Sequence, residues 1–205
     1  MIAIVDYGMG NLGSIFNMFR KIGVPAELTS DPGEIRNAAK IVLPGVGSFD
    51  AGMRNLEERG FIPVLRAAAV ECRVPILGIC LGMQLMAGKS EEGTLPGLGW
   101  LDADVVRFPS LVEGDRLKVP HMGWNLLEPR RECALFQGAG PGLRFYFVHS
   151  YHVVCRDPSD VAATTRYGAD FVSAFQHGNL YGVQFHPEKS HRFGMALLRN
   201  FAELA

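Results

Sequence analysis

The residues Pro75-Ile-Leu-Gly-Ile-Cys-Leu-Gly82 decide the fold that this sequence predicts. The apolar run Pro75–Ile79 is typical of a buried strand, and a helical stretch follows it. A sharp turn from strand to helix exposes the residue at its apex, and Gly78 and Gly82 remove side chains that would collide there. We therefore expect Cys80 to be presented as a nucleophile, with the N-terminus of the helix favouring its thiolate. The alternative is a small apolar cysteine of the core.

Outward from this turn, short apolar runs alternate with helical stretches, which is typical of βαβ units around a mostly parallel sheet. The expected strands on the N-terminal side are Ile2–Val5 and Ile41–Leu43, and the expected helices are Leu12–Ile22 and Phe61–Cys72. Beyond Gly99, alternating runs predict added, partly antiparallel strands at Arg144–Val148, Ala162–Tyr167 and Leu180–Phe185, and then a helix over Arg192–Leu204. The predicted fold class is α/β, with a mostly parallel central sheet flanked by helices and extended by antiparallel strands. A chain of 205 residues predicts one domain over residues 1–205.

Composition and charge argue against several classes of partner. The 20 basic and 21 acidic residues nearly cancel and are scattered, so no nucleic acid is expected to bind. No apolar run approaches the roughly 20 residues that span a bilayer, and Met1–Val5 lacks the flanks of a signal peptide. The four cysteines form no C-x-x-C pair, which is typical of reduced thiols in the cytoplasm. We therefore expect a cytoplasmic protein that does not associate with membranes.

The second chemical motif is His186-Pro187-Glu188. In an extended segment, alternate residues project to the same side, and Pro187 biases His186 toward that geometry. A carboxylate beside an imidazole fixes its tautomer and stabilises the imidazolium that forms when the ring takes a proton. With Cys80 present, the motif completes a nucleophile, a base and an orienting group. The alternative is a surface loop in which the His and Glu have no shared role.

These motifs also carry a resemblance to a known family. Gly78-Ile-Cys-Leu-Gly-Met-Gln84 together with Gln184-Phe-His-Pro-Glu188 resembles the triad (class I) glutamine amidotransferases. Further stretches narrow the resemblance to glutaminase subunits that serve a separate synthase subunit: Asp6–Leu12, Pro44–Gly47, Pro120–Asn125, Tyr146–Tyr151 and His186–Ser190. The resemblance covers the whole chain and implies a flavodoxin-like core.

The resemblance implies hydrolysis of L-glutamine to glutamate and ammonia through a glutamyl thioester on Cys80, with no cofactor and no metal. It makes His186 the general base and acid and Glu188 the orienting group. An oxyanion needs aimed donors, and the backbone N–H of Leu81 is one candidate. The turn Gly45-Val46-Gly47 offers a second donor, because its glycines permit unusual backbone angles, or else it is an ordinary glycine turn.

The resemblance also assigns residues to the substrate and to a partner. Its substrate-binding residues are Gln84, Glu92 and the backbone of Ser150 and Tyr151, although spacing alone would make Glu92 a solvated surface acid. The implied partner is a cyclase subunit with a (β/α)₈ barrel, in a heterodimer, which uses the ammonia on a ribotide. The residues expected at that interface are Met122, Trp124, Tyr146 and Lys189, and for Trp124 the alternative is a place in the core.

The alternative within the same class is the glutaminase domain of another amidotransferase, and functions of other classes also remain open from the residues alone. Gly8-Met-Gly-Asn-Leu-Gly13 satisfies G-x-G-x-x-G, and Asp31 stands near the distance of a ribose contact, which is typical of a dinucleotide-binding oxidoreductase. That interpretation leaves the cysteine and the His-Glu motif unused. The histidine pairs His149 with His152, and His186 with His191, are candidate metal ligands, although neither spacing is a known hydrolase signature. A non-enzymatic partner-binding module is a third class, against which the complete triad argues.

Overall fold

The centre of the molecule is a parallel sheet in a computed structural model that describes residues 1–112 and 115–204. Its strands lie in the order β2 (Ala26–Thr29), β1 (Ile2–Val5), β3 (Lys40–Leu43), β4 (Ile76–Ile79) and β15 (Leu180–Val183). All four of these pairings are parallel. In chain order this is 2-1-3-4-5, the order of flavodoxin-like folds. The predicted parallel core is therefore confirmed. The strand at Leu180, expected among the added strands, is instead the last strand of this core, because it pairs in parallel with β4.

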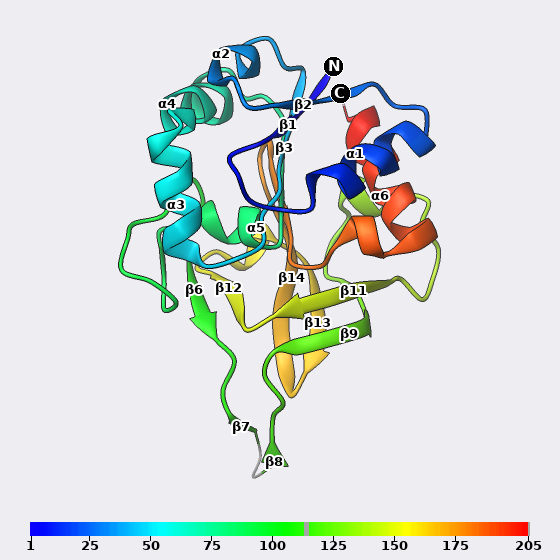
Figure 1. Cartoon of the computed structure of the whole chain (residues 1–205). Coiled ribbons are helices and arrows are strands. Elements are labelled where there is room, and N and C mark those ends of the chain that lie inside the picture. Colours follow the sequence, from blue (N-terminus) through cyan, green and yellow to red (C-terminus); the bar gives the residue numbers. More distant parts are fainter. Residues whose placement is uncertain (113–114, 205) are drawn as a thin grey trace.

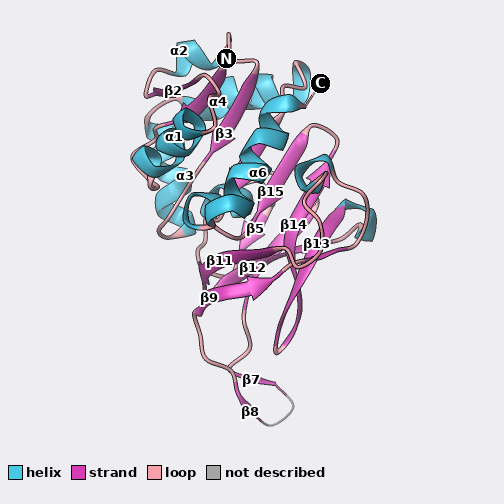
Figure 2. Cartoon of the chain, turned by 90° about the vertical axis from the view of Figure 1, so that its right-hand side faces the viewer, coloured by secondary structure: helices cyan, strands magenta, loops and turns pink. Residues whose placement is uncertain are grey.

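Antiparallel strands extend the sheet beyond β15, as predicted (Figure 2). They are β14 (Ala169–His177), β12 (Tyr151–Cys155) and β6 (Ala103–Arg107), with β5 (Lys89–Ser90) parallel to β6, β13 (Val161–Tyr167) paired with β14, and β10 (Glu128–Pro129) paired with β13. A separate ribbon pairs β9 (His121–Leu126) with β11 (Arg144–His149). The strands β7 (Leu111–Val112) and β8 (Asp115–Arg116) pair in a projecting arm within Arg107–Lys118, where the sequence offers nothing distinctive and where residues 113–114 lie outside the described residues.

Helices cover both faces of the parallel sheet (Figure 1). On one face lie α1 (Leu12–Lys21) and α6 (His191–Glu203), and on the other lie α2 (Pro32–Ile35), α3 (Phe49–Glu58) and α4 (Phe61–Arg66), which continues as a π-helical turn over Ala67–Glu71. The apolar stripe of α1 buries Ile15 and Phe19, four residues apart on one side of the helix. Each face therefore has its own hydrophobic core. In the described part of the chain, none of the helices combines the length and apolar character that crossing a membrane requires.

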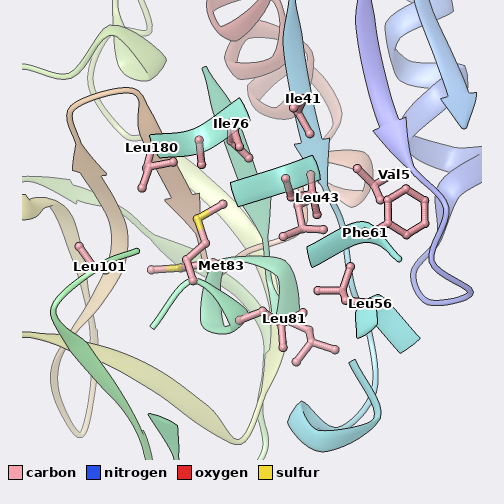
Figure 3. Packing of buried hydrophobic residues seen from close by; sticks show 14 of the residues in the cluster. Val5, Ile41, Leu43, Leu56, Phe61, Ile76, Leu81, Met83, Leu101 and Leu180 are labelled. Carbon is pink, nitrogen blue, oxygen red and sulfur yellow. The ribbon is translucent and has the colours of Figure 1, made fainter. Parts of the chain in front are cut away.

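The strand-to-helix turn at Cys80 is tightly packed. After β4 the chain turns directly into α5 (Leu81–Leu85), all of whose residues are buried. A Cβ at Gly82 would lie 1.8 Å from the carbonyl oxygen of Leu43, and one at Gly78 would lie 2.7 Å from the backbone nitrogen of Met83. Figure 3 shows Leu81 and Met83 of α5 among the buried side chains of this core. Only glycine allows α5 to come this close to the sheet, so both glycines are required by packing.

Candidate active site

Cys80 occupies the apex of this turn in a conformation that side chains rarely adopt. Its φ is +53° and its ψ is −109°, whereas non-glycine residues avoid positive φ outside turns and functional sites. The backbone N–H of Cys80 donates to the carbonyl of Val183 at 2.8 Å, which fixes the turn against β15. The thiol makes no capping bond to α5. The side chain is therefore held at the edge of the sheet and stays available for chemistry.

His186 and Glu188 follow β15 and form a buried pair. His186 Nδ1 lies 2.8 Å from Glu188 Oε1, and both side chains are only 2% exposed. Burial acts to lower the pKa of His186, but hydrogen bonds and charge interactions with Cys80 and Glu188 outweigh it and raise that pKa to about 10. His186 Nε2 is buried and makes no hydrogen bond of ordinary geometry within the described residues, so it is free for a proton in transit. The site can hold an imidazolium beside a sulfur nucleophile.

A cavity of about 350 Å³ opens in front of Cys80. Its walls contain every residue that the resemblance assigned to the substrate, and its lining is Val46, Gly47, Cys80, Leu81, Gln84, Glu92, Pro120, Val148, His149, Ser150 and Tyr151. A larger hollow of about 830 Å³ around Arg130 and Cys133 contains none of the predicted site residues. The smaller cavity is therefore the candidate substrate site, because it contains the predicted residues.

Two polar side chains of the cavity wall, Gln84 and Glu92, are fixed by hydrogen bonds to other parts of the protein. Gln84 Nε2 donates to the carbonyl of Tyr151 and to Gln184 Oε1, each at 3.0 Å. Both amide hydrogens are used in these bonds, so the carbonyl oxygen of Gln84 is what remains for a ligand. Glu92 Oε2 accepts from the backbone N–H of Phe49 at 2.8 Å, at the N-terminus of α3. Glu92 thus lies in the cavity wall, as the resemblance implies, and is not the solvated surface acid that its spacing alone suggested.

The candidate oxyanion donors are arranged differently from the expectation. The backbone N–H of Leu81 donates to the carbonyl of Gly45 at 3.3 Å, so this donor is engaged inside the protein. The buried hydroxyl of Tyr7 donates to the carbonyl of Pro44 at 2.7 Å and fixes the start of the turn. Val46 is exposed at the cavity mouth. The expectation that Leu81 offers a free N–H is not met in this conformation, and the Gly45 carbonyl must turn away before Leu81 can serve an oxyanion.

The glycine loop of the oxidoreductase interpretation has other contacts. A Cβ at Gly10 would lie 3.3 Å from Pro44 Cβ, so the loop packs against the turn beside Cys80. Asp31 Oδ1 accepts from the backbone N–H of Gly33 at 2.7 Å and caps α2. Its carboxylate is therefore used by the helix end. Among the described residues, no three His, Cys, Asp or Glu side chains converge as metal ligands would.

Of the residues predicted at a partner interface, Met122, Trp124 and Tyr146 lie on the β9–β11 ribbon, and Lys189 lies beside it in the turn Pro187–Lys189. Met122 is 61% exposed and Trp124 is 45% exposed, so Trp124 is not a core residue. Trp124 stands opposite Tyr146 in the ribbon, with ring centroids 6.3 Å apart, and Lys189 Nζ lies 5.6 Å from the Tyr146 ring. Sequence reasoning missed Leu126, which is 57% exposed. Its signal was the period-2 alternation of apolar side chains along β9.

Other residues of the site were also missed. Gln184 begins the motif Gln184–Glu188 and was assigned no role, yet its Nε2 lies 3.6 Å from Cys80 Sγ. Tyr146 was placed only at the interface, yet its carbonyl accepts from the backbone N–H of His186 at 2.9 Å. The ribbon therefore touches the His-Glu pair directly.

Comparisons with known proteins give the class of this protein. Residues 3–204 match the family model described as glutamine amidotransferase class-I. The chain therefore belongs to the class-I glutamine amidotransferase family. A solved glutamine amidotransferase covers 99% of this chain and 98% of its own at a TM-score of 0.71 and 21% identity, which confirms the fold.

More similar relatives narrow the class. The imidazole glycerol phosphate synthase subunit HisH 2 of Methanococcus maripaludis is 52% identical over 205 residues, with 100% of both chains covered. The subunit of the same name from Pseudomonas aeruginosa is 47% identical over 204 residues, again with 100% of both chains covered. The resemblance drawn from the sequence motifs is thereby confirmed.

Proposed function

We propose that this chain is the glutaminase subunit of imidazole glycerol phosphate synthase, an enzyme of histidine biosynthesis. It hydrolyses L-glutamine and passes the ammonia to a cyclase subunit. The observation that supports this most is that Cys80 has a positive φ, interacts with His186 of the His186–Glu188 pair, and lines a cavity of about 350 Å³. Names of full-length relatives support the same conclusion.

The proposed reaction uses each member of the triad once in each half. The Cys80 sulfur attacks the side-chain amide carbon of glutamine, and the carbonyl oxygen becomes an oxyanion. His186, protonated because its pKa is raised, gives its proton to the departing nitrogen, so that the C–N bond breaks and ammonia leaves. Neutral His186 then takes a proton from water, whose oxygen attacks the thioester and releases glutamate and the thiolate. Glu188 holds the ring in the tautomer that both steps need.

The cavity wall fits the two charged ends of an amino acid. The Glu92 carboxylate is the proposed partner of the substrate ammonium, and the backbone of Ser150 and Tyr151 receives the carboxylate. Gln84 offers its free carbonyl oxygen. We propose Leu81 and a residue of the Gly45–Gly47 turn as oxyanion donors once the turn has rotated.

The proposed partner is a (β/α)₈-barrel cyclase subunit that joins the ammonia to phosphoribulosyl formimino carboxamide ribotide. Its products are imidazole glycerol phosphate and aminoimidazole carboxamide ribotide. The exposed face of the ribbon, made by Met122, Trp124 and Leu126 with Tyr146 and Lys189, is the proposed docking surface. This surface is supported as the docking site because the carbonyl of Tyr146 accepts a hydrogen bond from the backbone N–H of His186. A partner bound to this face could therefore affect the position of His186. We place the heterodimer in the cytoplasm, because the described cysteines are free thiols, as is typical of a reducing compartment. We propose no nucleic-acid partner, because the 20 basic and 21 acidic residues nearly cancel, and no association with membranes.

The test is to separate glutamine-dependent from ammonia-dependent synthesis. Cys80→Ala, mixed with the purified barrel subunit, should lose synthesis from glutamine and keep synthesis from added ammonia, because the barrel chemistry does not use the thiol. Cys72→Ala is the matched control, since Cys72 is an exposed free cysteine, and it should keep both activities. A diazo or chloroketone analogue of glutamine should label Cys80 alone. Loss of the ammonia reaction in Cys80→Ala, or labelling at Cys72, would contradict the assignment, and thermal protection by NAD in place of glutamine would favour the oxidoreductase.

A further inference from the structure

Two buried histidines have no part in the proposed reaction. His121 begins β9 and His149 ends β11, where they stand opposite each other in the ribbon. Only 3% of His121 and 6% of His149 is exposed, and His121 Nδ1 lies 3.1 Å from His149 Nε2. The His121 ring stacks on Tyr167 at a centroid distance of 4.0 Å. Polar ring nitrogens in such a site are expected to be hydrogen-bonded, because a buried donor or acceptor without a partner is destabilising.

Their contacts fix which ring nitrogens carry protons. A carbonyl oxygen only accepts, so the bond of 2.8 Å between His149 Nδ1 and the carbonyl of Tyr151 places a hydrogen on His149 Nδ1. In a neutral ring the other nitrogen then accepts, so His121 Nδ1 is the donor to His149 Nε2. His121 Nε2 in turn accepts from the amide of Asn125 at 3.2 Å. Burial lowers the pKa of His149 to about 3 and that of His121 to about 4, which keeps both rings neutral.

The far end of this chain of bonds is the glutamine cavity. The same Tyr151 carbonyl accepts from Gln84 Nε2 at 3.0 Å, so both of its lone pairs are in use. Gln84 Nε2 also donates to Gln184 Oε1, and Gln184 Nε2 donates to Cys80 Sγ. His149 and Tyr151 both line the cavity. The histidine pair therefore supports the wall to which the substrate carboxylate is assigned.

We propose that His121 and His149 are positioning residues for glutamine, acting as a neutral imidazole pair that holds the Tyr151 carbonyl and, through it, Gln84. The inference rests on the proposed function, because it concerns the same substrate. His121 is next to the exposed Met122, so the pair also joins the docking strand to the substrate wall. The pair is not a metal site, because its facing nitrogens bond each other.

Two variants of His149 separate its two bonds. In His149→Asn the side-chain amide stands near the place of Nδ1, so it keeps the donor to Tyr151. In His149→Gln the amide reaches the place of Nε2, so it keeps the contact with His121 and loses that donor. We expect His149→Gln to raise the KM for glutamine about tenfold, the effect of one lost buried hydrogen bond, with kcat changed much less. His149→Asn should stay within about threefold of the wild type.

The measurements are glutaminase kinetics in the complex with the barrel subunit, and calorimetric binding of glutamine to the same variants on a Cys80→Ala background. Equal effects of the two substitutions on KM and on binding would show that the histidines only pack. Nitrogen NMR of the wild-type rings gives a readout that needs no variant to fold: it should show neutral Nδ1–H tautomers for both histidines. A hydrogen on His149 Nε2 at neutral pH would overturn the inference. Wild-type complex without glutaminase activity would instead refute the proposed function.

Discussion

The engaged oxyanion donor predicts that this chain alone is a poor glutaminase. The backbone N–H of Leu81 is bonded to the Gly45 carbonyl at 3.3 Å, so that a carbonyl oxygen stands where a donor is needed. Gly45 and Gly47 flank Val46, and Gly47 has a φ of +124°, which lets the peptide between them turn at low cost. Because Tyr7 holds Pro44 by its carbonyl, the rotation is confined to the residues that follow. Binding of the cyclase subunit with its ribotide is the perturbation that should turn the loop.

The expected loss of activity follows from the oxyanion donor that the bond between Leu81 and Gly45 occupies. Loss of one oxyanion donor reduces kcat by about 10²–10³, or roughly 3–4 kcal/mol. The single bond that must break, Leu81 to Gly45, is worth only about 1 kcal/mol net. Contacts with a partner that differ between the two loop states can supply that difference. Activation should therefore be large although the structural change is small.

The assay measures kcat and KM for glutamine with the chain alone, with empty barrel subunit, and with barrel subunit plus ribotide. We expect kcat to rise by about 10²–10³ in the last case and KM to change less, because the new contact is made only in the transition state. An isolated chain with full activity, or stimulation confined to KM, would refute the loop mechanism.

Two further predictions concern the triad and the histidine pair. His186→Ala should abolish glutaminase activity in the complex, whereas Glu188→Gln should reduce kcat less, because Gln still orients the ring while losing the charge; equal losses in kcat would contradict this. The free energy of unfolding should fall as the pH drops from about 6.5 toward about 4. The pKa values of His121 and His149 are lowered in the folded protein, so in this pH range only the unfolded chain takes up protons at these rings. Each histidine should contribute up to about 1.4 kcal/mol per pH unit. Urea unfolding between pH 5 and 7.5 measures this, and His149→Gln should flatten the slope by one histidine's share; an unchanged slope would contradict the assignment of neutral rings.

The sequence predicted those parts of the fold that local patterns specify. The turn at Cys80 was predictable because Gly78 and Gly82 are required by contacts only a few ångströms away. The strand at Leu180 was predictable as a strand, but its parallel partner β4 was not, because the pairing of Leu180 with Ile76 joins residues 104 positions apart. The short edge strand β2 was not predicted. Its four residues alternate apolar and polar types, but Leu28 is exposed and Thr29 is buried, so the apolar pattern does not follow burial there.

The candidate site divides in the same way. Cys80, His186 and Glu188 stand in compact motifs, whereas Glu92 acquires its place by reaching the N-terminus of α3, 43 positions earlier in the chain. The histidines show the limit most clearly. Spacing paired His149 with His152 as candidate metal ligands, but the ribbon register pairs it with His121, 28 positions away. Register between distant strands is set by tertiary packing, which no local spacing encodes.

The ribbon explains how a partner on its outer face can affect chemistry on its inner side. Strand β11 meets the triad at Tyr146, whose carbonyl accepts from His186 N–H at 2.9 Å and whose N–H donates to Ser190 Oγ at 3.0 Å. At its other end β11 carries His149, which holds the Tyr151 carbonyl in the cavity wall. Strand β9 is bonded along the whole of β11, so a partner that shifts the exposed side of β9 moves both ends together. Under the proposed function, substrate binding and proton transfer both depend on β11. Variants of His149 should then mainly change the KM for glutamine, and variants of Tyr146 should mainly change kcat.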